Sequence, residues 1–297
     1  MIEAEGIRKH FGSHQALKGV SFRVEDGQIV ALMGANGAGK STLFDILATI
    51  DSDFEGRALV DGFDVRTHPK DARARIGYVP GRFSLYGDLS VTENLEFFAG
   101  AYGCRAEDIE TLSPCLWKSL GDFTHFRADT LSGGMKQKLA ICCALVHNPS
   151  MLLLDEPTVG VDPVSRYDMW KEIGTLRDKG VSVLVSTHYL DEAGLADRIL
   201  FLHEGETLLF DSPEHIIRSY PHRLYSLPCS PAELPQFEAA LNAEPGVLDH
   251  YLWGDSLHFT ADASYAGTPL CGRKPSPVEP GIEDIFIDTL SSGRKRL

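Results

Sequence analysis

A glycine-rich segment carries the clearest chemical signal in the sequence, because it fits the pattern G-x-x-x-x-G-K-[ST] without a mismatch: Gly34, Ala35, Asn36, Gly37, Ala38, Gly39, Lys40 and Ser41. Glycines allow backbone N–H groups to close around a phosphate, and the N-terminus of a following helix adds a positive dipole end. We expect Lys40 to reach the β- and γ-phosphates of a nucleotide, the Ser41 hydroxyl to bind Mg²⁺, and Thr42 to assist at the phosphates. The segment lies between the apolar run 29–33 and a helix that starts near Ser41, and this context disfavours an ordinary glycine turn.

Two adjacent carboxylates, Asp155 and Glu156, follow the apolar run 151–154. We expect this run to be a strand beside the strand that precedes the glycine-rich segment, which brings both carboxylates to the phosphate site. Asp155 suits Mg²⁺ binding, directly or from the second shell, and Glu156 suits activation of the attacking water as a general base. The alternative for Glu156 alone is that it caps the next helix.

A second candidate anion site lies at Ser132, Gly133 and Gly134, where a predicted helix begins. Ser132 is a good N-cap residue, and the glycines expose backbone donors where the helix dipole is positive. Capping alone explains Ser132 but not the paired glycines, because glycine is a poor helix former.

The overall composition is that of an ordinary globular protein with an acidic surface. In 297 residues, 28 Lys and Arg against 42 Asp and Glu give a net charge of −14, so we expect no nucleic-acid partner. No apolar run reaches the roughly 18 residues that a membrane span needs, and the first residues lack the pattern of a secretory signal. The six cysteines show no CxxC spacing, which predicts reduced thiols in the cytoplasm.

Short apolar runs alternate with helical stretches up to about residue 210, which predicts a largely parallel sheet covered by helices. The runs 29–33, 151–154 and 181–185 are expected to be buried strands, with the chemical residues in the turns at their carboxyl ends. Residues 85–147 have a mostly helical pattern and predict an inserted helical subdomain. An apolar stripe recurs there with the period of a helix: Met135, Leu139, Cys142 and Val146.

Frequent prolines change the pattern after residue 220 and predict a domain boundary. We expect a first domain at 1–220 and a C-terminal accessory domain at 221–297, a small α+β unit that carries no phosphate-binding motif. Two strands and a helix are expected in this second domain: 224–227, 256–259 and 232–241.

The run Leu131–Gly134, with the sequence LSGG, resembles the signature of the ATP-binding cassette (ABC) ATPases, and other motifs extend the resemblance over about residues 2–215. The expected fold is therefore α/β, a P-loop NTPase core of the ABC ATPase type with the helical subdomain inserted and the small C-terminal domain added. In that family the signature of one subunit binds the γ-phosphate of ATP held by the P-loop of another. The resemblance implies that Ser132, Gly133 and Gly134 act in trans, on a second cassette that is another copy or a paralogous chain.

Further segments match other family motifs. Phe11, within HFG, resembles the aromatic residue that stacks on adenine, the alternative being a core Phe beside a turn. Asp162, within GVD, stands where the family has the D-loop that crosses the interface between cassettes. His188, within STH, resembles the switch histidine that contacts the γ-phosphate and helps to hold the water.

One position departs from the family pattern. The run 76–80 resembles the segment that leads into the Q-loop, but residue 81 is Gly81 where the family has glutamine. In the family this glutamine helps to coordinate Mg²⁺ and water, and it joins the core to the helical subdomain that meets the membrane subunit. Both roles are in question at Gly81, and Arg82 is too long and too positive to replace a Mg²⁺ ligand.

Within the family, the segments 86–95, 187–193 and 281–286 look like the daunorubicin-resistance type of export ATPase. This resemblance implies a cytoplasmic subunit that hydrolyses MgATP to power export of a drug-like or lipid-like molecule, peripheral on the cytoplasmic face of the membrane through separate membrane-spanning permease subunits. Two alternatives remain open. One is a soluble ABC ATPase of cofactor assembly, DNA repair or translation, and the other is a regulatory cassette whose ATPase has decayed at Gly81.

Overall fold

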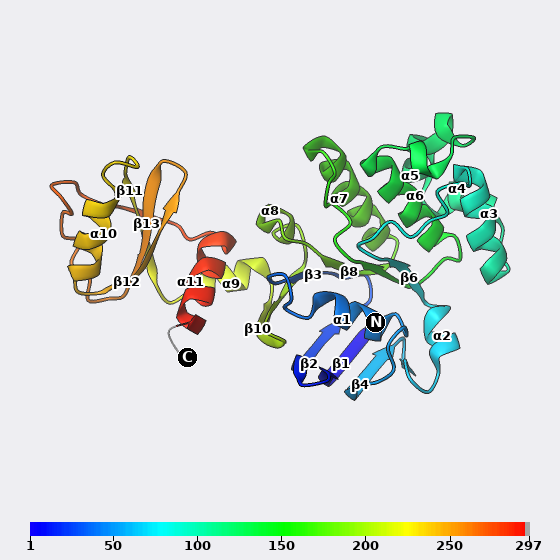
Figure 1. Cartoon of the computed structure of the whole chain (residues 1–297), viewed down its shortest axis with the longest axis horizontal. Helices are drawn as coiled ribbons and strands as arrows, with labels where there is room; N and C mark the ends of the chain where they lie inside the picture. The colour runs from blue at the N-terminus through cyan, green and yellow to red at the C-terminus, as the bar shows by residue number, and fades with distance from the viewer. Residues whose placement is uncertain (295–297) are drawn as a thin grey trace. The chain divides into compact units, whose positions relative to one another are not determined.

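The computed structural model describes residues 1–294, with side chains described up to residue 290. It divides into two compact units, 1–212 and 213 onward (Figure 1). Each unit has a hydrophobic core of its own. The division lies before the boundary predicted at residue 221. Helix α9 (Pro213–Ser219) packs against helix α11 (Ile282–Arg294), so it belongs to the second unit.

The first unit is built on a six-stranded sheet of order β10-β9-β3-β8-β7-β6, in which only β10 runs antiparallel to its neighbour. Its strands are β3 (Ile29–Met33), β6 (Ile76–Val79), β7 (Met151–Leu154), β8 (Ser182–Ser186), β9 (Arg198–His203) and β10 (Glu206–Asp211). β3, β7 and β8 are buried along their whole length, as expected of strands covered on both faces. The prediction that β7 lies beside β3 is wrong, because the crossover after β7 returns the chain to the middle of the sheet and places β8 between them.

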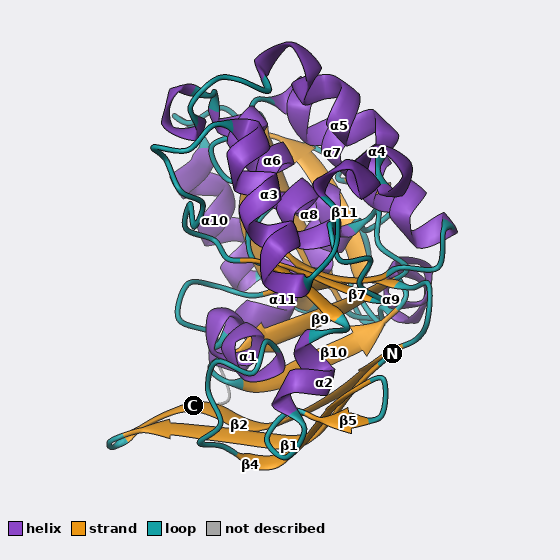
Figure 2. Ribbon diagram, turned by 90° about the vertical axis from the view of Figure 1, so that its right-hand side faces the viewer, coloured by secondary structure: helices purple, strands orange, loops and turns teal. Residues whose placement is uncertain are grey.

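A second sheet, of order β2-β1-β4-β5, is antiparallel throughout and runs along the bottom of Figure 2. Its strands are β1 (Ile2–Phe11), β2 (His14–Val24), β4 (Glu55–Val60) and β5 (Phe63–Asp64). The prediction of a largely parallel arrangement is wrong for this part of the chain. A short turn at 12–13 joins β1 to β2, and strands joined in this way pair antiparallel.

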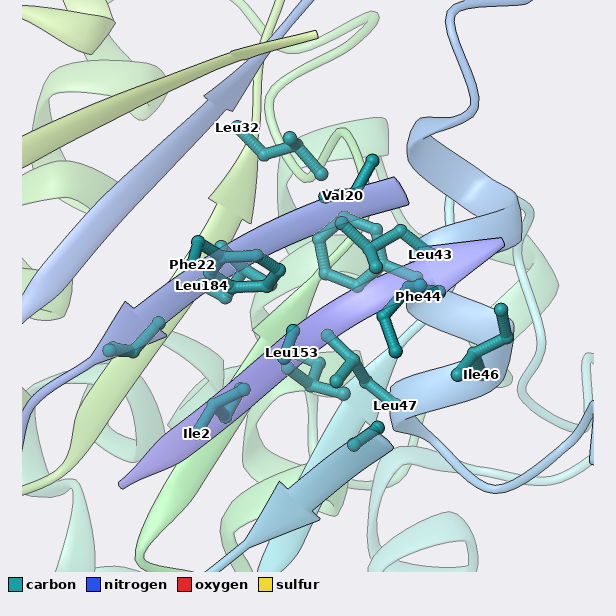
Figure 3. Close-up of a cluster of buried hydrophobic side chains, with 14 of the residues drawn as sticks. Ile2, Val20, Phe22, Leu32, Leu43, Phe44, Ile46, Leu47, Leu153 and Leu184 are labelled. Atoms are coloured by element: carbon teal, nitrogen blue, oxygen red, sulfur yellow. The ribbon is translucent and has the colours of Figure 1, made fainter. Parts of the chain in front are cut away.

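Helix α1 (Lys40–Leu47), which follows the glycine-rich loop, is packed in a hydrophobic core that both sheets share (Figure 3). Four of its apolar side chains enter this core, and burying each stabilises the fold by about 1.5–3 kcal/mol relative to exposure. Labelled in Figure 3, they are Leu43, Phe44, Ile46 and Leu47. The first turn of α1, which carries Lys40 and Ser41, is therefore fixed near the carboxyl end of β3 in the six-stranded sheet.

The helical part of the first unit occupies residues 91–145. It contains α3 (Val91–Tyr102), α4 (Ile109–Leu112), α5 (Pro114–Leu120) and α6 (Gly133–Leu145). α6 packs against α3, α5 and β6, and its second half is buried on every face, so the predicted apolar stripe is part of a central helix. The remaining helices of the unit are α2 (Pro69–Arg73), α7 (Pro163–Asp178) and α8 (Leu190–Ala193).

The second unit is a four-stranded antiparallel sheet of order β12-β13-β11-β14 with helix α10. Besides α9 and α11, its elements are β11 (Arg223–Pro228), α10 (Leu234–Ala243), β12 (Val247–Trp253), β13 (Ser256–Ala261) and β14 (Ser276–Val278). Phe237 and Leu241 of α10 pack on Leu227 and Phe259 of the sheet to form the core of this α+β unit. No helix in the described part of the chain has the length and apolar character needed to cross a membrane.

Candidate functional site

The glycine-rich loop has a backbone that only glycine allows at two positions. A Cβ at Gly34, where φ is +154°, would lie 2.4 Å from the Leu202 carbonyl oxygen, and one at Gly39, where φ is +102°, would lie 2.7 Å from the Ala16 carbonyl oxygen. Lys40 is 5% exposed, and its Nζ donates hydrogen bonds to the carbonyl oxygens of Gly34 at 2.8 Å and Ala35 at 3.3 Å. Burial lowers the pKa of Lys40, against the opposing attraction of nearby carboxylates. The loop thus surrounds one buried cation.

The Asp155 carboxylate is held between hydroxyl groups from two other elements. Ser41 Oγ donates to its Oδ2 at 2.9 Å, and Ser186 Oγ donates to its Oδ1 at 2.7 Å. Ser186 Oγ also accepts a hydrogen bond from the Glu156 N–H at 2.8 Å. Ser186 ends β8, the strand that separates β3 from β7. Its hydroxyl therefore lies where it can bind Asp155 and Glu156, which follow β7. No role for Ser186 was predicted from the sequence, although its place at the end of a strand was an available signal.

The Ser41 hydroxyl and the Asp155 carboxylate bring together hard oxygen donors of the kind that Mg²⁺ prefers. Within the described residues, no group of three or more His, Cys, Asp and Glu side chains is arranged to hold a metal ion. A cation at this edge of the sheet would therefore use few protein ligands and take the others from phosphate or water, which is the usual pattern for Mg²⁺.

Glu156 stands between two nitrogen-bearing side chains. Its Oε1 lies 2.7 Å from His188 Nε2 and 3.6 Å from Lys40 Nζ. Its backbone φ of 53° falls in the left-handed region, which costs a non-glycine residue of the order of 1–3 kcal/mol. The fold thus tolerates strain at the residue that sequence analysis selected as general base.

Phe11 lies on the rim of the hollow that contains the glycine-rich loop. Phe11 is 54% exposed, so the alternative of a core Phe is wrong, and Lys9 Nζ lies 4.9 Å from the centroid of its ring. The hollow has a volume of about 280 Å³ and is lined by Phe11, His14, Ala16, Asn36, Gly37, Gly39, Lys40, Ser41, Thr42 and Glu156. His14 was not singled out from the sequence. The structure therefore places an exposed aromatic residue and the glycine-rich loop around one hollow.

The LSGG residues lie against the D-loop of the same chain and do not line this hollow. Ser132 is the N-cap of α6 and accepts from the Met135 N–H at 3.3 Å. A Cβ at Gly133 would lie 3.2 Å from the Gly160 carbonyl oxygen, and one at Gly134 would lie 3.4 Å from the Val161 side chain. The glycines thus permit close packing on the D-loop.

Asp162 ends the D-loop and is the N-cap of α7. Its Oδ1 accepts hydrogen bonds from the Val164 and Ser165 N–H groups at 3.1 and 3.0 Å. Hydrogen bonds from Ser165 and Val164 hold the pKa of Asp162 below its ordinary value. Within this chain Asp162 fixes the start of α7 and does not line the hollow.

Gly81 lies directly beside Asp155. A Cβ at residue 81 would lie 3.2 Å from the Asp155 carbonyl oxygen and 3.6 Å from its carboxylate Oδ2. A side chain at this position would therefore start next to the oxygen that accepts the Ser41 hydrogen bond.

Comparison with known proteins decides the family. The model of the family described as ABC transporter matches residues 17–159. The Nod factor export ATP-binding protein I of Rhizobium sp. (strain N33) is 32% identical over 297 residues, covering 96% of this chain and 95% of that protein. The chain belongs to the ABC transporter family of ATP-binding proteins.

Another relative of this ABC cassette and a solved structure similar to it are also named as ATP-binding proteins of this family. The probable multidrug ABC transporter ATP-binding protein YbhF of Escherichia coli K12 is 41% identical over 220 residues, covering 73% of this chain. The chain spans only 38% of the length of YbhF. A dimeric ATP-binding cassette solved in a post-hydrolysis state with ADP and phosphate superposes with a TM-score of 0.64 at 27% identity, covering 71% of this chain and 98% of that one. The predicted family and the α/β ABC fold are confirmed.

Proposed function

We propose that this ABC cassette is the ATP-binding and ATP-hydrolysing subunit of an exporter. YbhF is named as a probable multidrug ABC transporter protein and the Rhizobium relative as a Nod factor export protein, and these names support a role in export. The substrate that we propose is drug-like or lipid-like and is carried by separate membrane-spanning subunits. The cassette then works in the cytoplasm, on the cytoplasmic face of the membrane.

The position of Glu156 is the observation that carries the proposed chemistry. Its carboxylate lies within hydrogen-bond distance of His188 and close to Lys40 at the mouth of the glycine-rich loop. Glu156 accepts the proton of the attacking water, His188 orients Glu156 and the water, and Lys40 pairs with the phosphate charge. Ser41 and Asp155 would hold Mg²⁺, which supplies neutralisation of phosphate charge when it is bound.

The first test is Glu156→Gln, which keeps the size of the side chain but removes the base. General-base catalysis contributes about 10²- to 10⁴-fold, so we expect ATP turnover to fall by about that factor. ATP binding should persist, because Lys40 and the backbone of the loop are unchanged. Glu206→Gln, an exposed carboxylate on β10, is the control and should leave turnover unchanged. Turnover of Glu156→Gln equal to that of the unaltered protein would refute the assignment.

We further propose that each ATP is shared by two cassettes. The LSGG residues pack against the D-loop of their own chain and do not line the hollow of that chain. A mixture of Lys40→Ala and Ser132→Arg chains tests this arrangement. Each variant alone has two defective sites in a homodimer, but a mixed pair contains one intact site and should regain part of the turnover. No recovery would mean that the site is not shared in this way between two copies.

A groove between the helical part and β6 is the proposed contact for the permease. It has a volume of about 270 Å³, and its mostly apolar lining includes Ile50, Leu85, Phe98, Tyr102 and Ala144. Tyr102 is 46% exposed. Tyr102→Glu should therefore reduce recovery of the cassette with membranes that contain its permease, with little change in the turnover of the isolated cassette. Unchanged membrane recovery would place the contact elsewhere.

A further inference from the structure

Glu192 is a buried carboxylate behind the site, and the proposed chemistry does not use it. It lies on α8 and is only 4% exposed. Its Oε2 accepts hydrogen bonds from Thr187 Oγ1 at 2.5 Å and Thr158 Oγ1 at 2.9 Å, and its Oε1 lies 3.5 Å from Arg166 Nη1. One carboxylate therefore joins three separate segments of the first unit.

Two of these segments carry the residues proposed for chemistry. Thr187 directly precedes His188, and Thr158 lies two positions after Glu156. Glu192 thus ties the loop after β7 to the loop after β8, and these are the loops that place Glu156 Oε1 2.7 Å from His188 Nε2.

The partners of Glu192 also fix the backbone that follows His188. The Tyr189 N–H donates to Thr187 Oγ1 at 3.0 Å, and the Arg166 guanidinium lies 4.1 Å from the centroid of the Tyr189 ring. Thr187, before His188, is therefore a partner of Glu192, and Tyr189, after it, contacts two of the partners of Glu192. This network therefore fixes the backbone position of His188.

Stability alone is a poor reason for such a group. A carboxylate removed from water pays a desolvation penalty that its partners often only balance, and an apolar residue of similar volume is frequently as stable or more so. A hydrogen-bonded carboxylate does, however, fix the angle and distance between the groups that it joins.

We propose that Glu192 is a positioning residue, which sets the relative placement of Glu156 and His188 through Thr158 and Thr187. This inference rests on the proposed function of that pair. Glu192 does not line the nucleotide hollow, so its effect is on turnover and not on ATP affinity.

The first measurement is the effect of Glu192→Gln on kcat and KM for ATP. A misplacement of about 1 Å at a reacting centre lowers rates by about 10²-fold, so we expect kcat to fall roughly 10- to 100-fold. KM for ATP should change by less than about three-fold, since a residue that acts only on the chemical step leaves uniform binding intact. Thr158→Val removes one donor and should lower kcat less, by roughly three- to ten-fold.

A double-mutant cycle separates positioning from a general loss of structure. If Glu192 acts through His188, then Glu192→Gln should lower turnover by less than about two-fold in a His188→Ala background, because the single effects cannot multiply. Thr260→Val is the matched control. It removes a hydrogen bond of the same type, from a buried threonine to the buried Asp288, in the second unit, and it should leave kcat unchanged.

The outcomes distinguish the role proposed for His188 from the role proposed for Glu192. If His188→Ala turns over normally, the role proposed for His188 is refuted, and the inference is refuted with it. If His188→Ala is impaired while Glu192→Gln and Thr158→Val keep the kcat of the unaltered protein, only the inference is refuted. Effects of Glu192→Gln and His188→Ala that multiply also refute it, because Glu192 then acts independently of His188.

Discussion

Replacing Gly81 with glutamine is the most informative single change in this cassette. The position faces the Asp155 carboxylate, with an ideal Cβ 3.6 Å from Oδ2. Its φ lies outside the left-handed region, so a side chain brings no backbone strain. A glutamine amide, two bonds beyond that Cβ, would reach the groups around Ser41 and Asp155 and add a polar contact at the reacting centre.

The size of the expected gain follows from two opposing effects. A hydrogen bond to a charged group contributes about 1.5–3 kcal/mol, which corresponds to roughly a ten- to hundred-fold higher rate if it forms fully only in the transition state. Against this, the Cβ would lie 3.2 Å from the Asp155 carbonyl oxygen, so the loop must shift by a few tenths of an ångström. Gly81→Ala introduces this crowding without the amide.

The assay is steady-state phosphate release at saturating MgATP, for the unaltered protein, Gly81→Ala and Gly81→Gln. We expect Gly81→Ala to be equal to the unaltered protein or slower, and Gly81→Gln to exceed Gly81→Ala by at least about ten-fold. Stimulation by membranes that contain the permease should rise more than basal turnover, because residue 81 also begins the segment that leads to the helical part. Equal rates for the two variants would refute the reasoning and show that the site needs no amide at this position.

Three other predictions concern the scaffold. Lys9→Met should lower the free energy of unfolding at pH 7 by roughly 1–3 kcal/mol, because Lys9 Nζ pairs with the Asp51 carboxylate at 2.7 Å. Burial alone would raise the pKa of Asp51, but its hydrogen bonds with Lys9 Nζ and with the backbone hold the pKa below the ordinary 3.8. The contribution of this pair to stability is therefore present above pH 3.8 and is lost below it. Denaturant titrations at pH 7 and at low pH should show that the difference in the free energy of unfolding between the unaltered protein and Lys9→Met shrinks at low pH. Residues 1–212 alone should still bind a fluorescent ATP analogue, since every residue of the hollow lies within them, and loss of binding by a folded fragment would contradict this. A thiol reagent at pH 8, followed by mass spectrometry, should label exposed cysteines in the folded protein and buried ones only after unfolding: Cys115 and Cys271 against Cys142, Cys143 and Cys229.

Local chemistry made much of the site predictable from the sequence. The predicted runs 29–33 and 151–154 coincide with β3 and β7, because continuous apolar runs flanked by polar turns are typical of buried parallel strands. The loop glycines were recognisable because they stand at fixed positions of the local pattern G-x-x-x-x-G-K-[ST]. Neither inference needed information about distant parts of the chain.

Long-range pairing was less predictable. The place of β8 between β3 and β7 depends on a crossover that no local pattern records, and the bridging role of Ser186 follows only from that place. Glu192 reads in the sequence as an ordinary acidic residue near the start of a helix. Its burial becomes visible only when three separate segments converge. β12 was missed because it is half-exposed along its length and its sequence shows no strict alternation.

The packing of Gly133 and Gly134 on the D-loop has a kinetic consequence. If each ATP is shared by two cassettes, as we propose, the glycine-rich loop and the LSGG residues of one chain belong to two different sites, and a solitary chain has no complete reaction centre. Turnover per chain should therefore not be constant. In dilute solution it should rise in proportion to protein concentration and level off once most chains are paired, so the total rate should follow the square of concentration at first. The same dependence would make hydrolysis in the cell scarce wherever cassettes are not gathered by a common permease.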